Sequence, residues 1–171
     1  NGLKKQRRAT EIISRQKEEV HKQKEIIETH QKETIDSINY AKRIQYALLA
    51  QNNLLEKFIP NHFVYFNPKD IVSGDFYWAT EHNNKFYIAV CDSTGHGVPG
   101  AFMSLLNIGF LSEAINEKNI VKPHEVLNYV RQRLLESIGN DGQQDGMDAV
   151  LVCFDKNTHT ITYAAANNEP I

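Results

Sequence analysis

Hydrophobic positions recur at helical spacing through the first third of the chain. Residues 1–58 contain one glycine and no proline and are rich in Lys, Glu and Gln, a composition typical of a continuous helix. Positions seven residues apart carry Ile13, Val20, Ile27, Thr34, Ala41, Leu48 and Leu55. The companion positions three residues later are mostly polar, so the pattern predicts a helix that can pair as a coiled coil, but only weakly.

The apolar stripe of this helix widens towards its end. The positions that we assign to regulation are Ile38, Ala41, Ile44, Leu48 and Leu55. A face this broad could pack on a folded domain instead of on a single partner helix. Two interpretations stay open: a solvated linker helix or docking arm, and a dimerising signal helix.

From Phe63 onward, short apolar runs alternate with turn residues. Strands are predicted at 63–66, 75–79, 85–91, 149–154 and 160–165, with hairpin turns at 81–84 and 156–159. Helices are predicted from about residue 101 to 116 and from Pro123 to Gly139, because proline suits a first helical turn. Hairpins with two consecutive helices between them indicate an α+β fold, an antiparallel sheet covered by helices.

The overall composition is that of an ordinary globular protein, with 41% hydrophobic and 23% charged residues. A net charge of -2 gives no support to a nucleic-acid partner. Cys91 and Cys153 lack a CxxC partner, so a disulfide framework or zinc site is not expected and a reducing cytoplasm fits best. No signal peptide or membrane segment is expected in these residues, although the chain could be the cytoplasmic part of a larger, membrane-linked sensor.

Candidate chemistry lies at three predicted strand ends, each with an aspartate close to a glycine. Asp75 follows Gly74, Asp92 ends a buried strand, and Asp148 comes two residues after Gly146. Carboxylates at the ends of neighbouring strands can meet at one sheet edge, and Mg²⁺ and Mn²⁺ prefer such oxygen ligands. Taken singly, an aspartate near a glycine is more often a simple turn.

The loop after Asp92 also matches the GxGxxG pattern of a dinucleotide-binding fingerprint, between Gly95 and Gly100. The element predicted after the following helix is another helix and not a parallel strand. The fingerprint also leaves Asp92 unexplained. A nucleotide site is therefore the weaker interpretation.

Four motifs follow one another along the chain: Val72-Ser73-Gly74-Asp75-Phe76-Tyr77-Trp78, Cys91-Asp92-Ser93-Thr94-Gly95-His96-Gly97-Val98-Pro99-Gly100-Ala101, Asp145-Gly146-Met147-Asp148-Ala149 and Ala164-Ala165-Ala166-Asn167-Asn168-Glu169-Pro170. In this order and spacing they resemble the SpoIIE/RsbU-like phosphatases, the bacterial branch of the PPM (protein phosphatase 2C-like) superfamily. Glu169 is an insertion relative to the form of the last motif. The resemblance implies a regulatory helix over 1–58 and, over 59–171, part of an αββα sandwich of antiparallel sheets.

The resemblance implies two divalent cations, Mn²⁺ or Mg²⁺, at one edge of the sandwich. Asp75 matches the first metal aspartate, Asp92 the bridging one, the Ser93 carbonyl a backbone ligand, and Asp148 a later metal aspartate. In such sites a metal-bound water attacks the phosphate directly, with no protein nucleophile. The expected reaction is hydrolysis of phosphoserine or phosphothreonine.

Two further residues are candidates for smaller roles. In the eukaryotic branch the motif histidine stands where this chain has Thr94, and His96 comes two residues later. A loop-structuring or metal-water role for His96 is therefore favoured over general acid catalysis. Lys69 could attract the substrate phosphate, but a solvated turn lysine is the simpler interpretation.

The resemblance also implies a biological setting. The expected substrate is a phosphorylated regulator such as an anti-sigma factor antagonist, and the helix is expected to form a homodimer and transmit a signal. The family's last metal aspartate and remaining strands would come after Ile171, so we expect little activity from these 171 residues alone. The alternative is a non-catalytic coiled-coil signalling module whose phosphatase-like part is a dimerisation or docking platform.

Overall fold

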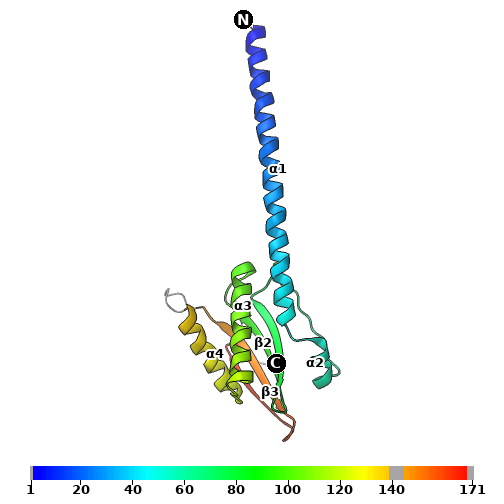
Figure 1. Cartoon of the computed structure of the whole chain (residues 1–171), viewed down its shortest axis with the longest axis vertical. Helices are drawn as coiled ribbons and strands as arrows, with labels where there is room; N and C mark the ends of the chain where they lie inside the picture. Colours follow the sequence, from blue (N-terminus) through cyan, green and yellow to red (C-terminus); the bar gives the residue numbers. More distant parts are fainter. Residues whose placement is uncertain (1, 139–144, 169–171) are drawn as a thin grey trace. The chain divides into compact units, whose positions relative to one another are not determined.

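The computed structural model describes residues 2–138 and 145–168 (Figure 1). The chain divides into two compact units, Asn1–Tyr40 and Ala41–Ile171. The first unit belongs to one helix, α1 (Gly2–Leu48), whose last residues belong to the second unit. The second unit holds the remaining helices and all the described strands.

The first unit is a charged helix with an apolar seam. Lys22 and Glu18, one turn apart, lie 2.8 Å from each other, and pairs of this kind stabilise a helix by about 0.2–0.5 kcal/mol. The seam residues Val20 and Ile27 are each 63% exposed in the single chain. This unit therefore presents apolar side chains that its own residues do not cover.

The prediction of one continuous helix over residues 1–58 is wrong, because the structure breaks the helix after residue 48. Leu49 and Ala50 are buried, and the Ala50 N–H donates to the Tyr77 carbonyl at 3.3 Å. A second helix, α2 (Asn52–Phe58), begins after Gln51, whose backbone is extended. Burial of two apolar side chains and one hydrogen bond to the edge strand of the sheet interrupt the helix without any glycine or proline.

Four antiparallel strands form one sheet in the order β1-β2-β3-β4. They are β1 (Asp75–His82), β2 (Lys85–Ser93), β3 (Met147–Asp155) and β4 (Thr160–Ala166). The turn between β1 and β2 has two residues, and both Asn83 and Asn84 have a positive φ, 49° and 62°, as a type I′ hairpin turn requires. Both predicted hairpins are confirmed, with strands somewhat longer than predicted.

Two long helices cover one face of this sheet (Figure 1). α3 (Gly97–Ser112) contacts β1 and β2 and continues into a turn of π-helix, η1 (Glu113–Glu117). α4 (Pro123–Ile138) contacts β3 and β4. The strand side chains that face these helices form the core: Phe76, Trp78, Tyr87, Ala89, Cys91, Ala149, Leu151 and Cys153. This arrangement confirms the α+β fold class predicted from the sequence.

The described residues cover the opposite face of the sheet only in part. α2 packs at one end of it, where Phe58 stacks on Phe86 with ring centroids 4.3 Å apart. The strand predicted at 63–66 is wrong: this segment is in no described strand, and Phe63 is 91% exposed. Its apolar pattern is that of a strand, but no described strand pairs with it, so it belongs to no ladder. The described residues thus contain one sheet of the expected two-sheet sandwich.

By length and composition alone, one stretch of the second unit, Gly97–Glu117, could cross a membrane. In its most apolar 18 residues the mean hydropathy is 1.4, and 56% of that part is buried inside the protein. A helix that packs on a sheet has the same composition, because most of its surface is covered by other residues. This stretch is therefore weak evidence for a membrane segment.

Candidate metal centre

The three candidate aspartates lie in one row at one edge of the sheet. The strand register pairs Asp75 with Asp92 and Asp92 with Asp148. Residues paired in this way point to the same face of a sheet. Their face is the one away from α3 and α4, because the next residues along, Phe76 and Cys91, are buried on the helix side. The sheet register therefore brings together three carboxylates that are far apart in sequence.

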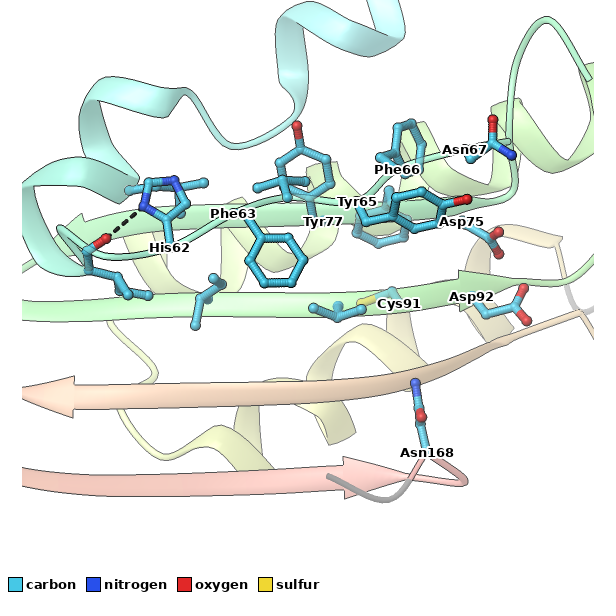
Figure 2. A pocket seen from close by; sticks show the side chains of 16 residues that line it. His62, Phe63, Tyr65, Phe66, Asn67, Asp75, Tyr77, Cys91, Asp92 and Asn168 are labelled. Atoms are coloured by element: carbon cyan, nitrogen blue, oxygen red, sulfur yellow. Dashed lines mark hydrogen bonds between the residues drawn. The ribbon is translucent and has the colours of Figure 1, made fainter. Parts of the chain in front are cut away.

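Asp75 and Asp92 interact directly at the ends of β1 and β2 (Figure 2). The pKa of Asp75 is raised above its usual value, first by burial and then by a hydrogen bond with Asp92 and the negative charge of Asp92. Two adjacent carboxylates favour either a shared proton or a bound cation. The excess negative charge at this position therefore fits a divalent cation.

Asp148 is held by a residue that follows β4. Asn167 Nδ2 donates to Asp148 Oδ2 at 2.9 Å, and Asn167 has a φ of 53°. Asn167 belongs to the last motif, whose Glu169 and Pro170 lie outside the described residues. Within residues 2–138 and 145–168, no three His, Cys, Asp or Glu side chains gather closely enough to hold a metal ion. The row thus aligns three carboxylates, of which two interact directly.

The glycines of this region pack backbone against backbone. A Cβ at Gly74 would clash with the carbonyl oxygens of Ser93 and Gly95, and a Cβ at Gly100 would clash with the same Gly95 carbonyl. Gly95 has a φ of 92°, which side chains rarely permit. The Ser93 N–H also donates to the Gly74 carbonyl at 3.3 Å. These glycines therefore allow the loop before β1, the loop after β2 and the first turn of α3 to pack closely, and the dinucleotide interpretation is not needed to explain them.

Thr94 joins the loop after β2 to the start of β3. Its N–H and its hydroxyl both donate to the Gly146 carbonyl, at 3.0 and 3.2 Å, and the Gly146 N–H donates to Thr94 Oγ1 at 3.0 Å. These bonds hold the segments that carry Asp92 and Asp148 next to each other. This role cannot be predicted from the sequence, because the two partners are 52 positions apart and no local pattern links them.

His96 contacts the loop that leads into β1. Its Nδ1 lies 3.0 Å from Asp70 Oδ2, and its side chain is 77% exposed. The loop-structuring role of His96 stays a prediction, and its partner Asp70 was not among the residues singled out from the sequence. Lys69 is exposed on the same loop, and its contact with a phosphate stays a prediction.

Ser93 and Cys91 flank Asp92 on the buried side of β2. Ser93 is 2% exposed, and its hydroxyl accepts a hydrogen bond from Asn107 Nδ2 at 2.9 Å. Burial raises the pKa of Cys91 to about 12, so this thiol is not a nucleophilic thiolate near neutral pH. Cys91 and Cys153 are both free. Cys91 is therefore not a candidate nucleophile, and the ligand role of the Ser93 carbonyl stays a prediction.

The positions assigned to regulation differ widely in burial. Leu55 is 2% exposed and belongs to the small cluster under α2. The other four are Ile38 in the first unit, half-buried Ala41, and Ile44 and Leu48, which are each 44% exposed. In the part of α1 that belongs to the second unit, the most buried residue is Gln45, at 1% exposed. Gln45 cannot be found from apolar spacing, because its side chain is polar.

An apolar cavity of about 600 Å³ lies beside the acidic pair. Its walls come from the extended segment 59–67 and from β1 and β2, and they are mostly aromatic and aliphatic. Figure 2 shows Phe63, Tyr65 and Phe66 on the segment that runs alongside the strands, and Asp75 and Asp92 at one end of the group. The two carboxylates are thus accessible from the face of the sheet that α3 and α4 do not cover.

Comparison with known proteins agrees with this geometry. The family described as Stage II sporulation protein E (SpoIIE) matches residues 82–171, just over half of the chain. None of the curated protein sequences matches. Among solved structures, the SiaA-PP2C domain of Pseudomonas aeruginosa is similar, with a TM-score of 0.70 and 34% sequence identity; the match covers 80% of this chain and 55% of that one. This chain therefore spans about half the length of that structure. On this evidence of motifs, fold and sequence, the chain belongs to the SpoIIE family and has the fold of PP2C-like phosphatases.

Proposed function

We propose that residues 41–171 belong to an enzyme that hydrolyses phosphoserine or phosphothreonine on a bacterial regulatory protein. The observation that carries the proposal is the row of Asp75, Asp92 and Asp148 on three neighbouring strands. Membership of the SpoIIE family and likeness to a PP2C domain support phosphatase chemistry. A phosphorylated anti-sigma factor antagonist is the substrate class that we propose from the family resemblance.

We propose that these carboxylates hold two divalent cations, Mn²⁺ or Mg²⁺. Carboxylate oxygens are the ligands that these ions prefer, and a cation would relieve the repulsion between Asp75 and Asp92. When bound, such metals supply an activated water for direct attack on phosphorus. Asp75, Asp92, Asp148 and the Ser93 carbonyl are the groups that would hold these ions, with Asp92 at the position of the family's bridging aspartate.

Other residues of the chain orient these ligands. Asn167 donates to Asp148 and so restricts the directions in which this carboxylate can point. Thr94 holds the neighbouring strand ends together through its bonds with Gly146. We assign His96 to loop structure and Lys69 to attraction of the substrate phosphate, the latter as a point charge on an exposed loop.

We also propose that the first unit dimerises in the cytoplasm and passes a signal from an upstream sensor to the second unit. The exposed seam of α1, which includes Val20 and Ile27, supports a second copy of the helix as the partner. A homodimer would bury these apolar side chains, which are otherwise in contact with water.

A second candidate function is a non-catalytic signalling module in which the phosphatase-like unit is a platform. One observation favours it: among the described residues, no three His, Cys, Asp or Glu side chains lie near enough to one another to bind the same metal ion. The two candidates differ in what they require of Asp92. Only the enzyme loses metal binding and turnover when this carboxylate is removed.

The test is Mn²⁺ titration by calorimetry, together with phosphate release from a phosphoserine protein by the protein at its natural full length. Asp92→Asn should weaken Mn²⁺ binding by about tenfold or more and abolish turnover. Asp36→Asn, which removes an exposed carboxylate from α1, is the matched control and should change neither. Equal Mn²⁺ affinity in Asp92→Asn and the unsubstituted protein would overturn the proposed metal centre. Absence of turnover by the unsubstituted protein would favour the platform.

A further inference from the structure

The polar residues buried in this protein gather behind the aspartates. Among the described residues, the buried polar side chains are Gln45, Ser73, Ser93, Ser104 and Asn107. A polar group removed from water costs free energy unless it is hydrogen-bonded, so such groups are few in a core. Here all five take part in hydrogen bonds that lead to the loops around Asp75 and Asp92.

Gln45, in the last turn of α1, binds the backbone of the loop before β1. Its Nε2 donates to the Ser73 carbonyl at 2.6 Å and to Ser104 Oγ at 2.7 Å, and its Oε1 accepts from the Ser73 N–H at 3.1 Å. The amide therefore satisfies both backbone groups of one residue, as a neighbouring strand would. Ser73 Oγ in turn accepts a hydrogen bond from the Asp75 N–H at 3.0 Å.

A second set of bonds reaches the residue after Asp92 from α3. Asn107 Nδ2 donates to Ser93 Oγ at 2.9 Å, and the Ser93 N–H donates to the Gly74 carbonyl. Ser104 and Asn107 are three residues apart and so share one face of α3. Among the described residues, Asn107 Oδ1 is the one buried side-chain nitrogen or oxygen atom with no hydrogen-bond partner. These bonds connect α3 to the strand end that carries Asp92.

We propose that Gln45 is a positioning residue that aligns Asp75 with Asp92 for metal binding and so couples the end of α1 to the metal centre. This inference rests on the proposed function. The connection is continuous, from the Gln45 amide to the Ser73 backbone, and from the Ser73 hydroxyl to the Asp75 N–H. A displacement of α1 that breaks the amide contacts would free the backbone of Ser73 and change the position of Asp75.

Gln45→Leu tests the proposal, because leucine is of similar size and helix propensity but has no donor or acceptor. Hydrogen–deuterium exchange of the metal-free protein should show the Ser73 amide exchanging about tenfold faster, with the amides between β2 and β3 unchanged. Mn²⁺ affinity, measured by calorimetry, should fall about 10- to 100-fold, as is usual when a group that orients a ligand is lost. Gln132→Leu, at an exposed position of α4, is the matched control and should change neither measurement.

Each outcome decides the question. Unchanged exchange at Ser73 in Gln45→Leu overturns the proposal, and so does unchanged Mn²⁺ affinity if Asp75→Asn loses binding. If Asp75→Asn and Asp92→Asn both bind Mn²⁺ normally, the proposed metal centre fails, and exchange at Ser73 alone decides whether Gln45 holds this loop. If Gln45→Leu does not fold, Ser104→Ala is the second test, because it removes one of the two groups that accept a hydrogen bond from Gln45 Nε2. It should change both measurements in the same direction by a smaller factor, and no change in either would overturn the proposal.

Discussion

Replacing Gly74 with alanine would add one methyl group where the loops that carry Asp75 and Asp92 pack most closely. The new Cβ would clash with the carbonyl oxygens of Ser93 and Gly95. Both are backbone atoms, so neither can rotate aside as a flexible side chain would. The Ser93 N–H bond to the Gly74 carbonyl already holds the same two segments together. Relief therefore has to come from movement of the loops themselves.

The expected cost follows from this geometry. Adding a methyl group to a tightly packed site costs about 1–3 kcal/mol. In a chain of 171 residues 1 kcal/mol corresponds to roughly 2–4 °C in Tm, so Gly74→Ala should lower Tm by roughly 2–12 °C. Gly109 in α3 is the matched control, because a Cβ there meets no atom within 4 Å. Gly109→Ala should stabilise the protein by about 0.5–1 kcal/mol, since alanine is the better helix former.

Thermal melts followed by circular dichroism, without metal, would measure both substitutions. A Mn²⁺ titration of the folded proteins would then show whether Gly74→Ala also weakens metal binding, as expected if the loops move apart. Gly109→Ala should bind Mn²⁺ like the unsubstituted protein. A Gly74→Ala protein that melts at or above the unsubstituted one would refute the reasoning, as would an equal loss of stability in both variants.

Two further predictions concern charge and assembly. Because the pKa of Asp75 is raised in the folded state, its contribution to stability is complete below about pH 4 and is lost as pH rises through the raised pKa. Without metal, Asp75→Asn should therefore be more stable than the unsubstituted protein at pH 7, by less than about 1 kcal/mol because water screens the charge. This difference in the free energy of unfolding should vanish towards pH 4. A difference that chemical denaturation shows to be independent of pH would contradict the assignment. Val20→Glu should convert a dimer to a monomer in light scattering, whereas Ser14→Glu, outside the seam, should not. If the Val20→Glu protein has the same mass as the unsubstituted protein, the helices do not pair through this seam.

Local sequence patterns were sufficient to predict the hairpins and the two helices between them. Asn83 and Asn84 tolerate positive φ, and apolar side chains alternate on both sides of them, so the first hairpin is encoded in adjacent residues. Pro123 starts α4 where predicted. The fold class follows from these local signals because antiparallel strands joined by short turns leave few possible arrangements.

The errors and omissions have a common physical cause. Whether the segment 63–66 forms a strand depends on a neighbouring strand, and the break after residue 48 depends on a contact with the sheet edge. Gln45 and Thr94 act through partners 28 and 52 positions away. Such contacts have no periodic signal, so the aspartates could be found from the sequence and the residues that hold them could not.

The turn at Asn83 and Asn84 lies at the opposite end of the first hairpin from Asp75 and Asp92, yet it determines their alignment. Side chains alternate between the two faces of a strand, so a change of one residue in pairing moves every side chain of β1 to the other face. Inserting a single residue into this turn could therefore send Asp75 towards the helices and leave Asp92 without its neighbour, while every residue of the centre stayed the same. The number of residues in a distant turn is as necessary to this centre as the carboxylates themselves.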